Sequence, residues 1–491
     1  MVSPRAFLVA AVLLVAASVS GCDHVAVVGA VDGEVTGTPA QTQTPGQTPA
    51  PTPGQTPAPP ARCPAPAVPA AVPAPAGRIV VTSGERQTIA GWGASVVTDT
   101  YIDPLVDPTT MTAKQVEAMD RALFVDARIN LVRVFGPGFG QAKVDAPPAA
   151  RANDRALAFM RRVAPYGVRF MFTGAKAPPE LMTGRRLRFG AEAQYAAWVG
   201  AYLRAAKLFG APFAFAAAAN EPENRASRLQ MTSAQSALVY GALAAELAAN
   251  GPQDTKLVLG DTTGWGSACP FAVALTADPA LPPAAAAYAT HPYFGTLTQA
   301  RGLAERANSA GLDVWQTEFG TGCATCHDRG GIHEAMNWSL QIAGGLDAGR
   351  TSAWFAFRGI ADSTHGPGDA LLVRERRNRK RPFYASKRFH VFRQYSTVAP
   401  PGSAVLEVAE RLPAVTAVAF RDGDRVSVVV TNSGRATHPV ELDLGDAPGT
   451  ITPRRTSFRE DFRALPKLRY DGAPLRVDLA GESVTTLTLS P

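Results

Sequence analysis

Apolar residues recur along the chain in eight short runs, each of which ends in small, polar or charged residues. Longer segments separate most of these runs, and in them apolar residues recur every three or four positions, as in residues 193–210 and 236–251. The short runs predict buried parallel strands, and the longer period predicts amphipathic helices that cover them. The eight runs are residues 88–95, 130–138, 168–175, 213–222, 256–265, 287–295, 313–320 and 351–359.

Strands and helices that alternate eight times predict an α/β fold, a (β/α)8 TIM barrel, over residues 78–398. From about residue 399 onward, apolar and polar residues alternate at period two, and turn residues such as those at 421–424 interrupt the alternation. This pattern is typical of antiparallel strands joined by hairpins. We therefore expect a second domain at residues 399–491, a C-terminal antiparallel β-sandwich.

The first residues of the chain indicate export. An apolar run at 6–19 follows Arg5, and small residues then lead into Cys22. This anatomy is typical of a bacterial lipoprotein signal peptide, residues 1–21, cleaved before a cysteine that becomes lipidated. The run is too short for a permanent transmembrane helix. We therefore expect an extracytoplasmic protein that a lipid on Cys22 anchors to the cell membrane or cell surface.

Residues 22–77 are rich in Pro, Thr, Ala, Gly and Gln, which predicts a disordered linker between the lipidated cysteine and the barrel. The chain has a net charge of +7 and a pI near 9.3, but its basic residues are mostly scattered, and an exported protein rarely meets nucleic acid. One basic run, residues 374–381, is concentrated. A solvated loop explains it most simply, and contact with anionic glycans or lipid headgroups is the alternative.

Lipidation of Cys22 would leave four cysteines, an even number in an oxidising compartment: Cys63, Cys269, Cys323 and Cys326. One or two disulfides are expected, and the sequence does not choose among the three complete pairings. Residues 323–327 also form the C-x-x-C-H string that attaches c-type haem. The string follows the seventh predicted strand with no separate domain to enclose a haem. A zinc site that includes His333 is another alternative, and a disulfide that reaches Cys269 is the role we favour.

Catalytic residues of TIM barrels lie at the carboxyl ends of the strands, so the residues predicted there are candidates. Two of them are glutamates, Glu221 and Glu318, on different strands that face one mouth. Hydrolysis of a glycosidic bond needs such a pair, one acid to protonate the leaving oxygen and one carboxylate to attack or to activate water. A structural ion pair with an arginine is the alternative for either glutamate. The candidates are Arg133, Asn220, Glu221, Asp261, His291, Tyr293, Glu318 and Trp354.

The motifs around these residues resemble glycoside hydrolase family 30, a clan A family of retaining enzymes. The resemblance rests on "QTIAGWGAS" (87–95), Asn220-Glu221-Pro222, "ATHPYFG" (289–295), "DVWQTEFG" (313–320) and the segment 383–402, and it extends over roughly residues 78–491. It implies that Glu221 is the general acid/base and Glu318 the nucleophile. It also implies that no metal or cofactor takes part.

The resemblance implies further substrate-binding residues at the mouth. Asn220 is similar to the residue that holds the sugar 2-hydroxyl, and Arg133 and Tyr293 are similar to groups that hydrogen-bond the nucleophile. His291 would line the same pocket. Among the tryptophans, alternation along the seventh strand predicts that Trp315 packs under the helices if Glu318 points inward. We expect Trp354 to form the floor of the sugar pocket.

Two segments depart from the family pattern. Residues 173–182 carry Lys176 where the family is rich in tryptophan, and the eighth strand ends in Phe357 and Arg358. These changes leave both glutamates in place but alter the predicted sugar-binding wall, and the two cations raise the hypothesis of an acidic or substituted sugar.

The sequence as a whole predicts a monomeric, surface-anchored hydrolase of β-linked glycans that cleaves by a two-glutamate double displacement with retention. One alternative is a glycosidase or transglycosylase from another clan A family that uses the same glutamate pair. A second alternative, from a different class of protein, is a surface glycan-binding protein that has lost turnover.

Overall fold

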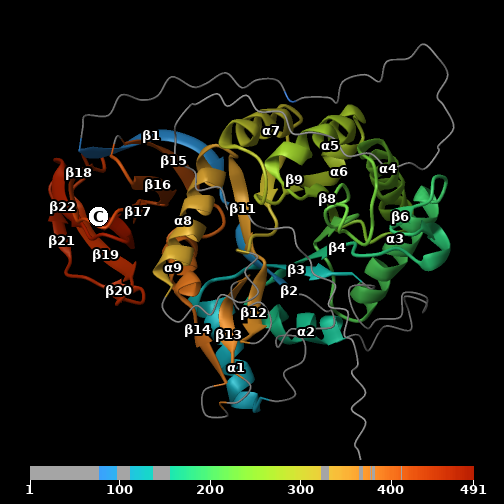
Figure 1. The fold of residues 1–491 in the computed structure, drawn as a ribbon, viewed down its shortest axis with the longest axis horizontal. Helices are drawn as coiled ribbons and strands as arrows, with labels where there is room; N and C mark the ends of the chain where they lie inside the picture. Colours follow the sequence, from blue (N-terminus) through green and yellow to red (C-terminus); the bar gives the residue numbers. More distant parts are fainter. Residues whose placement is uncertain are drawn as a thin grey trace, which may run out of the picture. The chain divides into compact units, whose positions relative to one another are not determined.

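The structure is a computed structural model. It describes residues 63, 77–96, 111–136, 155–321, 331–363, 369–375, 378, 382–410 and 412–491, all within one compact unit, Pro59–Pro491. Figure 1 shows the fold. The predicted signal peptide, Cys22, most of the predicted linker and residues 323–327 lie outside the described residues.

The predicted barrel is confirmed, and each of the eight apolar runs forms one of its strands. All of its strand pairs are parallel, and the sheet closes on itself when β11 pairs with β2. Around the barrel the strands are β2 (Gly91–Val96), β3 (Leu131–Phe135), β4 (Arg169–Thr173), β7 (Phe215–Ala217), β8 (Lys256–Thr262), β9 (Ala285–Thr290), β10 (Asp313–Gln316) and β11 (Thr351–Ala356).

Alternation along these strands sorts apolar side chains into two layers. One cluster fills the inside of the barrel and includes Leu131, Met171, Val258, Trp315 and Phe355. The intervening residues of the same strands point outward and join the larger core between strands and helices. Side chains at every second position of a strand share one face, so the same alternation continues to the strand ends, where the polar residues begin.

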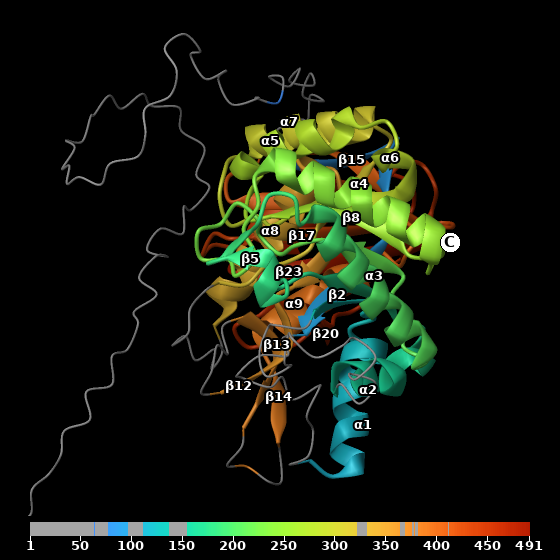
Figure 2. The ribbon, with the colours of Figure 1, turned by 90° about the vertical axis from the view of Figure 1, so that its right-hand side faces the viewer.

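Helices cover the outside of the barrel, and Figure 2 shows α3, α4, α5 and α7 along one side of it. Two helices begin with a capping box, Thr112 with Gln115 and Thr296 with Gln299, which pairs backbone N–H groups at the helix start. No helix among the described residues is both long and apolar enough to cross a bilayer. The helices are α1 (Ala113–Arg121), α2 (Arg155–Val163), α3 (Glu192–Leu208), α4 (Ser233–Asn250), α5 (Trp265–Ala277), α6 (Leu281–Ala284), α7 (Leu297–Ser309), α8 (Ile332–Asp347) and α9 (Lys387–Ser396).

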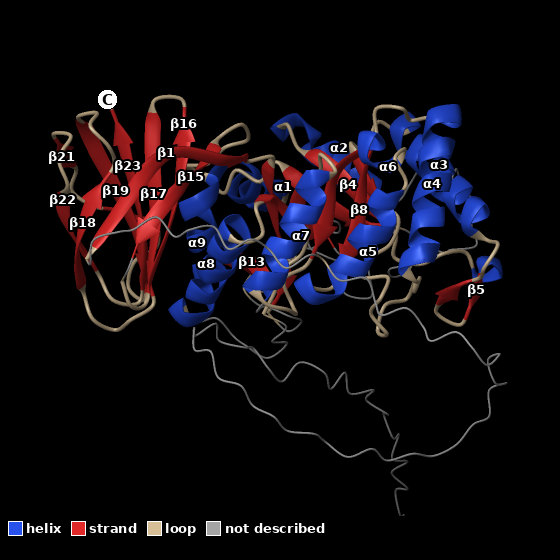
Figure 3. Cartoon of the chain, turned by 90° about the horizontal axis from the view of Figure 1, so that it is seen from above, coloured by secondary structure: helices blue, strands red, loops and turns tan. Residues whose placement is uncertain are grey.

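The C-terminal residues form the predicted β-domain, a mainly antiparallel sheet with its own apolar core. Figure 3 shows it as a body of strands and loops. Its strands are β15 (Ala404–Glu410), β16 (Val415–Asp422), β17 (Arg425–Asn432), β18 (His438–Asp443), β19 (Gly449–Ser457), β20 (Arg463–Ala464), β21 (Leu468–Tyr470), β22 (Leu475–Leu479) and β23 (Ser483–Ser490).

One strand of this sheet comes from the start of the globular part. Strand β1 (Arg78–Thr88) lies between β15 and β18, antiparallel to the first and parallel to the second. The segment just before the barrel is therefore part of the C-terminal sheet, an arrangement that period-two alternation after residue 399 does not reveal.

Buried polar contacts join the sheet to the last two helices of the barrel. Ser339 of α8 shares a hydrogen bond of 2.6 Å with Thr431 of β17. On α9, the Gln394 side chain donates to Thr456 of β19 and accepts from Thr486 of β23. Buried groups that are paired in this way specify one arrangement of the two surfaces.

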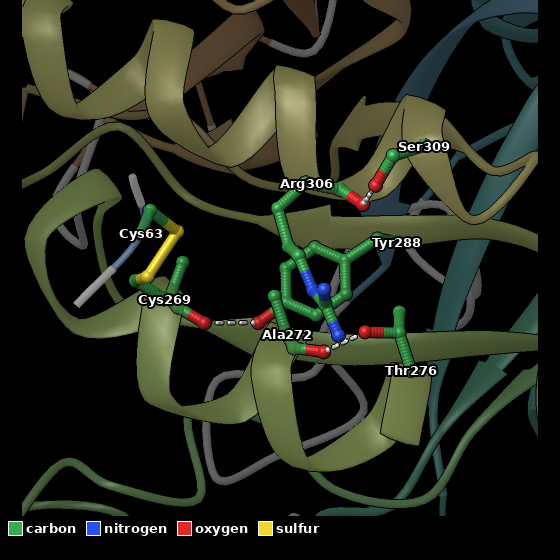
Figure 4. The surroundings of a disulfide bond; sticks show 8 residues. Cys63, Cys269, Ala272, Thr276, Tyr288, Arg306 and Ser309 are labelled. Atoms are coloured by element: carbon green, nitrogen blue, oxygen red, sulfur yellow. Dashed lines mark hydrogen bonds between the residues drawn. A yellow bond between two sulfur atoms is a disulfide. The ribbon is translucent and has the colours of Figure 1, made fainter. Parts of the chain in front are cut away.

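A disulfide joins Cys63 to Cys269 in α5 (Figure 4). Next to it, the Tyr288 hydroxyl of β9 donates to the carbonyl of Ala268, which ties the same turn of α5 to the barrel. The expectation that Cys269 pairs with the 323–327 segment is therefore wrong. Its partner belongs to the Pro-rich segment, and only the folded geometry brings the two thiols together.

Candidate active site

Alternation brings polar side chains to the interior at the mouth of the barrel. On β3, Leu131 packs inside, so Arg133 points to the same face two residues later. On β9, Ala287 and Ala289 fill the interior, and His291 follows at the same period. Both Arg133 and His291 are completely buried. The strand period alone thus turns one guanidinium and one imidazole toward the interior of the barrel.

Asp261 reaches the same place by a different route. Strict alternation would put it outside, because Leu259 on the same strand packs in the outer core. The register between β8 and β9 shifts around Asp261, and its backbone φ is 60°. Such an irregularity re-aims a side chain. The Asp261 carboxylate accepts hydrogen bonds of 2.6 Å from the hydroxyls of Thr173 and Thr317.

Glu221 follows β7 on a tightly held backbone. The N–H of Asn220 donates to the carbonyl of Gly174, and the N–H of Glu221 donates to the carbonyl of Asp261, each at 2.8 Å. The φ of Glu221 is 48°, a value that non-glycine residues seldom adopt. The Asn224 side chain donates to Glu221 Oε2 at 2.7 Å. These contacts fix the carboxyl group at the mouth.

Glu318 lies just beyond β10, where alternation ends. Trp315 lies inside the barrel, in edge-to-face contact with Phe215 at 4.8 Å. The expectation that Trp315 packs under the helices is therefore wrong, although its assignment to the core holds. Thr317 and Glu318 are consecutive, yet both side chains contact groups at the mouth. Strand β10 ends at Gln316, so alternation no longer turns Thr317 and Glu318 to opposite faces.

Trp354 does not form the floor of a pocket. On β11, Ala353 and Phe355 take the inward positions, so Trp354 points outward. It is almost completely buried and packs against Trp338 of α8 and Phe392 of α9, with ring centroids 5.3 and 6.0 Å away. The expectation of a sugar-stacking face was wrong because it took no account of strand alternation.

Arg133 is the centre of the hydrogen bonds at the mouth. Its Nη1 donates to Glu318 Oε2 at 2.8 Å, and its Nη2 donates to Asp261 Oδ2 at 2.8 Å and to the Asn220 side-chain oxygen. The Tyr293 hydroxyl donates to the other oxygen of Glu318 at 3.0 Å. Both oxygens of Glu318 are thus held by donors, as the sequence resemblance implies.

His291 bridges the carboxylates. Its Nδ1 lies 2.9 Å from Glu221 Oε1, and its Nε2 lies 3.4 Å from Asp261 Oδ1 and 3.9 Å from Glu318 Oε2. Burial by itself would lower the pKa of His291, but the charge of Glu318 and the hydrogen bonds to Asp261 and Glu221 outweigh it and raise the pKa to about 10. A carboxylate at each ring nitrogen favours the imidazolium, which can donate to both.

The two glutamates lie close enough to titrate as a pair. One side-chain oxygen of each lies within 4.8 Å of the other. Burial raises the pKa of Glu318, although the charges of His291 and Arg133 oppose it. Burial would also raise the pKa of Glu221, but the hydrogen bond and charge of His291 lower it overall. The ligand-free site therefore keeps Glu221 ionised beside the imidazolium.

Glu221, His291 and Glu318 also form a set of possible metal ligands. Their surroundings do not suit a metal ion. The guanidinium of Arg133 already neutralises Glu318, and a protonated His291 has no free lone pair to offer. A divalent ion would have to displace these cations, so the donor set fits proton transfer better than metal binding.

Other residues complete the mouth. Phe135 and Ala175 form a small apolar cluster with Phe357, the residue that departs from the family pattern on the eighth strand. The guanidinium of Arg358 lies 5.2 Å from the centre of the Phe357 ring. Lys176 is half-buried in the loop after β4. Of the three residues that depart from the family pattern, Lys176 thus lies on the loop after β4, Phe357 follows β11, and Arg358 begins strand β12 (Arg358–Asp362).

Several residues on which this site depends have no role predicted from the sequence. Asp261 was visible as a polar residue at a strand end, but the bulge that turns it inward has no clear sequence signal. Thr173 and Thr317 look like ordinary strand-end threonines. Asn224, three residues after Glu221, lies in a loop whose conformation decides its contact.

No protein-family profile and no curated protein matches the sequence. Solved structures match the fold. The chain superposes on a GH30 endoxylanase from Clostridium papyrosolvens C71 with a TM-score of 0.67 and 16% identity, over 84% of this chain and 100% of that one. It superposes on an endo-β1,6-glucanase with a TM-score of 0.66 and 15% identity, over 84% of this chain and 94% of that one. It superposes on SrfJ from Salmonella typhimurium with a TM-score of 0.69 and 16% identity, over 84% of this chain and 93% of that one. At these identities the likeness establishes the fold.

Replacement of Asp261 by Asn should destabilise the protein strongly. It removes a buried negative charge that Arg133 and His291 both contact, which typically costs about 3–5 kcal/mol. The matched control is Asp254→Asn, which breaks an exposed pair with Lys207 and should cost less than about 1 kcal/mol. Urea denaturation measures both. Similar losses for the two variants would contradict the importance of the buried cluster.

The stability of the protein should fall in alkaline solution because of His291. Its pKa of about 10 lies above the value of about 6.5 expected in an unfolded chain, so its contribution is complete below about pH 6.5 and is lost as the pH rises toward 10. We expect the melting temperature of the wild type to fall more steeply from pH 7 to 10 than that of His291→Gln. Parallel curves would show that His291 is not charged in the folded protein.

Proposed function

We propose that the protein is a retaining glycoside hydrolase that cleaves β-glycosidic bonds of a polysaccharide or oligosaccharide. The observation that carries this proposal is the pair Glu221 and Glu318, whose carboxyl oxygens approach within 4.8 Å at the mouth of a (β/α)8 barrel. Retaining enzymes hold their two carboxyl groups about 5–5.5 Å apart, whereas inverting enzymes need about 6.5–9.5 Å to admit a water.

The roles proposed for the glutamates follow from their partners. Arg133 and Tyr293 donate to both oxygens of Glu318, which favours the ionised carboxylate needed for attack and opposes the rise in its pKa that burial causes. In the first step a Glu318 oxygen bonds to the anomeric carbon, and the bond to the leaving oxygen breaks. The leaving oxygen keeps the electron pair of the broken bond and takes a proton from Glu221. The product of this step is a covalent glycosyl-enzyme.

In the second step Glu221 acts as a base. Its carboxylate removes a proton from water, and the water oxygen bonds to the anomeric carbon as the Glu318 carboxylate departs. Two displacements on one carbon return the original configuration, so the mechanism retains the anomer. Glu221 ends the cycle with this proton, which His291 then takes back through the contact between its Nδ1 and Glu221 Oε1.

The proton for the first step must reach Glu221, whose pKa is lowered in the ligand-free site. His291 supplies the means, because its Nδ1 lies 2.9 Å from Glu221 Oε1 and the ring carries a proton at neutral pH. A sugar bound between the glutamates would exclude water and weaken the charge separation, which favours transfer of that proton to Glu221. Glu318 then keeps Arg133 and Tyr293 as its stabilising donors.

The other predicted residues would hold the sugar. The side-chain oxygen of Asn220 is bound by Arg133, which orients its amide nitrogen and suits a contact with the 2-hydroxyl. One structural neighbour is an endoxylanase and another is an endo-β1,6-glucanase, so enzymes with this fold act on different polymers. The fold therefore supports a β-linked glycan substrate. A panel of β-linked polymers identifies which glycan it is.

The proposed location is the outer face of a membrane, with Cys22 lipidated. It is supported by the apolar run, the small residues before Cys22 and the Pro-rich segment after it. Intact mass of the native full-length protein should show loss of residues 1–21 and the added mass of a lipid. A mass that retains those residues would contradict the anchor.

Azide should distinguish the roles of the two glutamates. With an activated aryl β-glycoside of the sugar that the wild type accepts, Glu318→Ala should yield the α-glycosyl azide, because azide attacks in place of the missing nucleophile. Glu221→Ala should yield the β-glycosyl azide from the glycosyl-enzyme. Each variant should lose at least about 100-fold in kcat on the natural glycan. Nuclear magnetic resonance identifies the anomers.

The control for this experiment is Glu305→Ala, which removes an exposed glutamate of α7 and should leave the rate unchanged. Exchange of the two azide anomers between the variants would reverse the proposed roles. A wild type that binds a glycan but releases no product from a panel of β-linked xylans, glucans and galactans would contradict hydrolysis and favour a glycan-binding protein.

A further inference from the structure

The loop that carries Glu221 holds a second carboxyl group, Glu223, to which the proposed reaction gives no role. One of its oxygens, Oε1, accepts hydrogen bonds from the backbone N–H of Thr263 at 2.6 Å and from the Ser267 hydroxyl at 2.5 Å. Thr263 lies just before α5, and Ser267 lies in its first turn. Glu223 thus connects the loop after β7 to the helix that follows β8.

This connection supplements the contacts of Glu221 itself. The N–H of Glu221 donates to the carbonyl of Asp261, and the N–H of Asn224 donates to the carbonyl of Glu221. A backbone φ of 48° at Glu221 persists only where neighbouring contacts hold it. Glu223 lies between Glu221 and Asn224 in the sequence, so its bonds to α5 restrain the strained residue from the other side.

Glu223 keeps one oxygen without a hydrogen-bond partner among the described residues. This oxygen, Oε2, is buried. Burial raises the pKa of Glu223, hydrogen bonds from Ser267 and Thr263 lower it in part, and the nearby charge of Glu221 raises it further. A carboxyl group that is costly to bury needs a reason to be there, and the contacts of Glu223 with Thr263 and Ser267 suggest one.

We propose that Glu223 is a positioning residue, which clamps residues 220–224 to the start of α5 and thereby holds Glu221 against the leaving oxygen. This inference rests on the proposed function, because it assumes that Glu221 is the general acid. A misplaced acid slows the first displacement only where the leaving group needs a proton, and kcat/KM reports that displacement. The proposal therefore predicts a defect that depends on the leaving group.

The test compares two aryl β-glycosides of the same sugar, one with phenol and one with 2,4-dinitrophenol as the leaving group. Dinitrophenolate departs with little help from an acid, whereas phenolate needs the proton. For Glu223→Ala we expect kcat/KM to fall at least about 10-fold on the phenyl glycoside and less than about 3-fold on the dinitrophenyl glycoside. Glu223→Gln keeps an acceptor oxygen and should show a smaller difference between the substrates.

The matched control is Cys63→Ser. It removes the disulfide that ends on α5 two residues beyond Ser267, but it touches neither Glu223 nor its donors. This variant should keep the wild-type ratio of the two rates. A changed ratio in the control would show that any disturbance of α5 has the same effect, which would overturn a specific role for Glu223. Equal losses on both substrates in Glu223→Ala would also overturn it.

A second readout needs no activity. Amide hydrogen exchange in residues 220–224 should accelerate in Glu223→Ala without any ligand, because the clamp is lost. Unchanged exchange would overturn the clamp itself. A wild type that hydrolyses neither glycoside would refute the proposed function, and with it the acid role of Glu221, while the exchange measurement would still decide whether Glu223 holds the loop.

Discussion

The burial of Arg133 between carboxylates is the constraint on which this structure depends. A guanidinium with no exposure to water must have its charge compensated, and Asp261 and Glu318 compensate it at 2.8 Å each. His291 adds a second cation among the same carboxylates and reaches Glu221. The cluster requires strands β3, β8, β9 and β10 to end at one level, which the closed barrel provides.

How much the sequence predicted depends on whether local pattern decides the outcome. The eight strands follow from apolar runs, and Arg133 and His291 follow from alternation with their apolar neighbours. Glu221 and Glu318 stand out because a glutamate after a buried strand is unusual. The prediction that Trp354 forms a pocket floor is wrong because alternation along β11 turns its side chain outward. The bulge at Asp261 arises from tertiary pairing, which no local pattern encodes.

The same distinction applies beyond the site. Period-two alternation located the C-terminal sheet, but only the folded chain shows that β1 fills a place between β15 and β18. Four cysteines left the pairings open, and the structure joins Cys63 to Cys269 on α5. That helix also receives Glu223 through Ser267. The disulfide and the hydrogen bond from Ser267 to Glu223 thus both involve α5, and no sequence motif marks that helix.

The central claim is that Glu221 and Glu318 act together by double displacement, and the configuration of the first product tests it most directly. Proton nuclear magnetic resonance, recorded within minutes of adding the wild-type protein to its β-linked substrate, resolves the two anomers before they interconvert. The account predicts that the β-anomer forms first and the α-anomer appears later by mutarotation. An α-anomer that forms first would contradict it, because a single displacement would then have taken place.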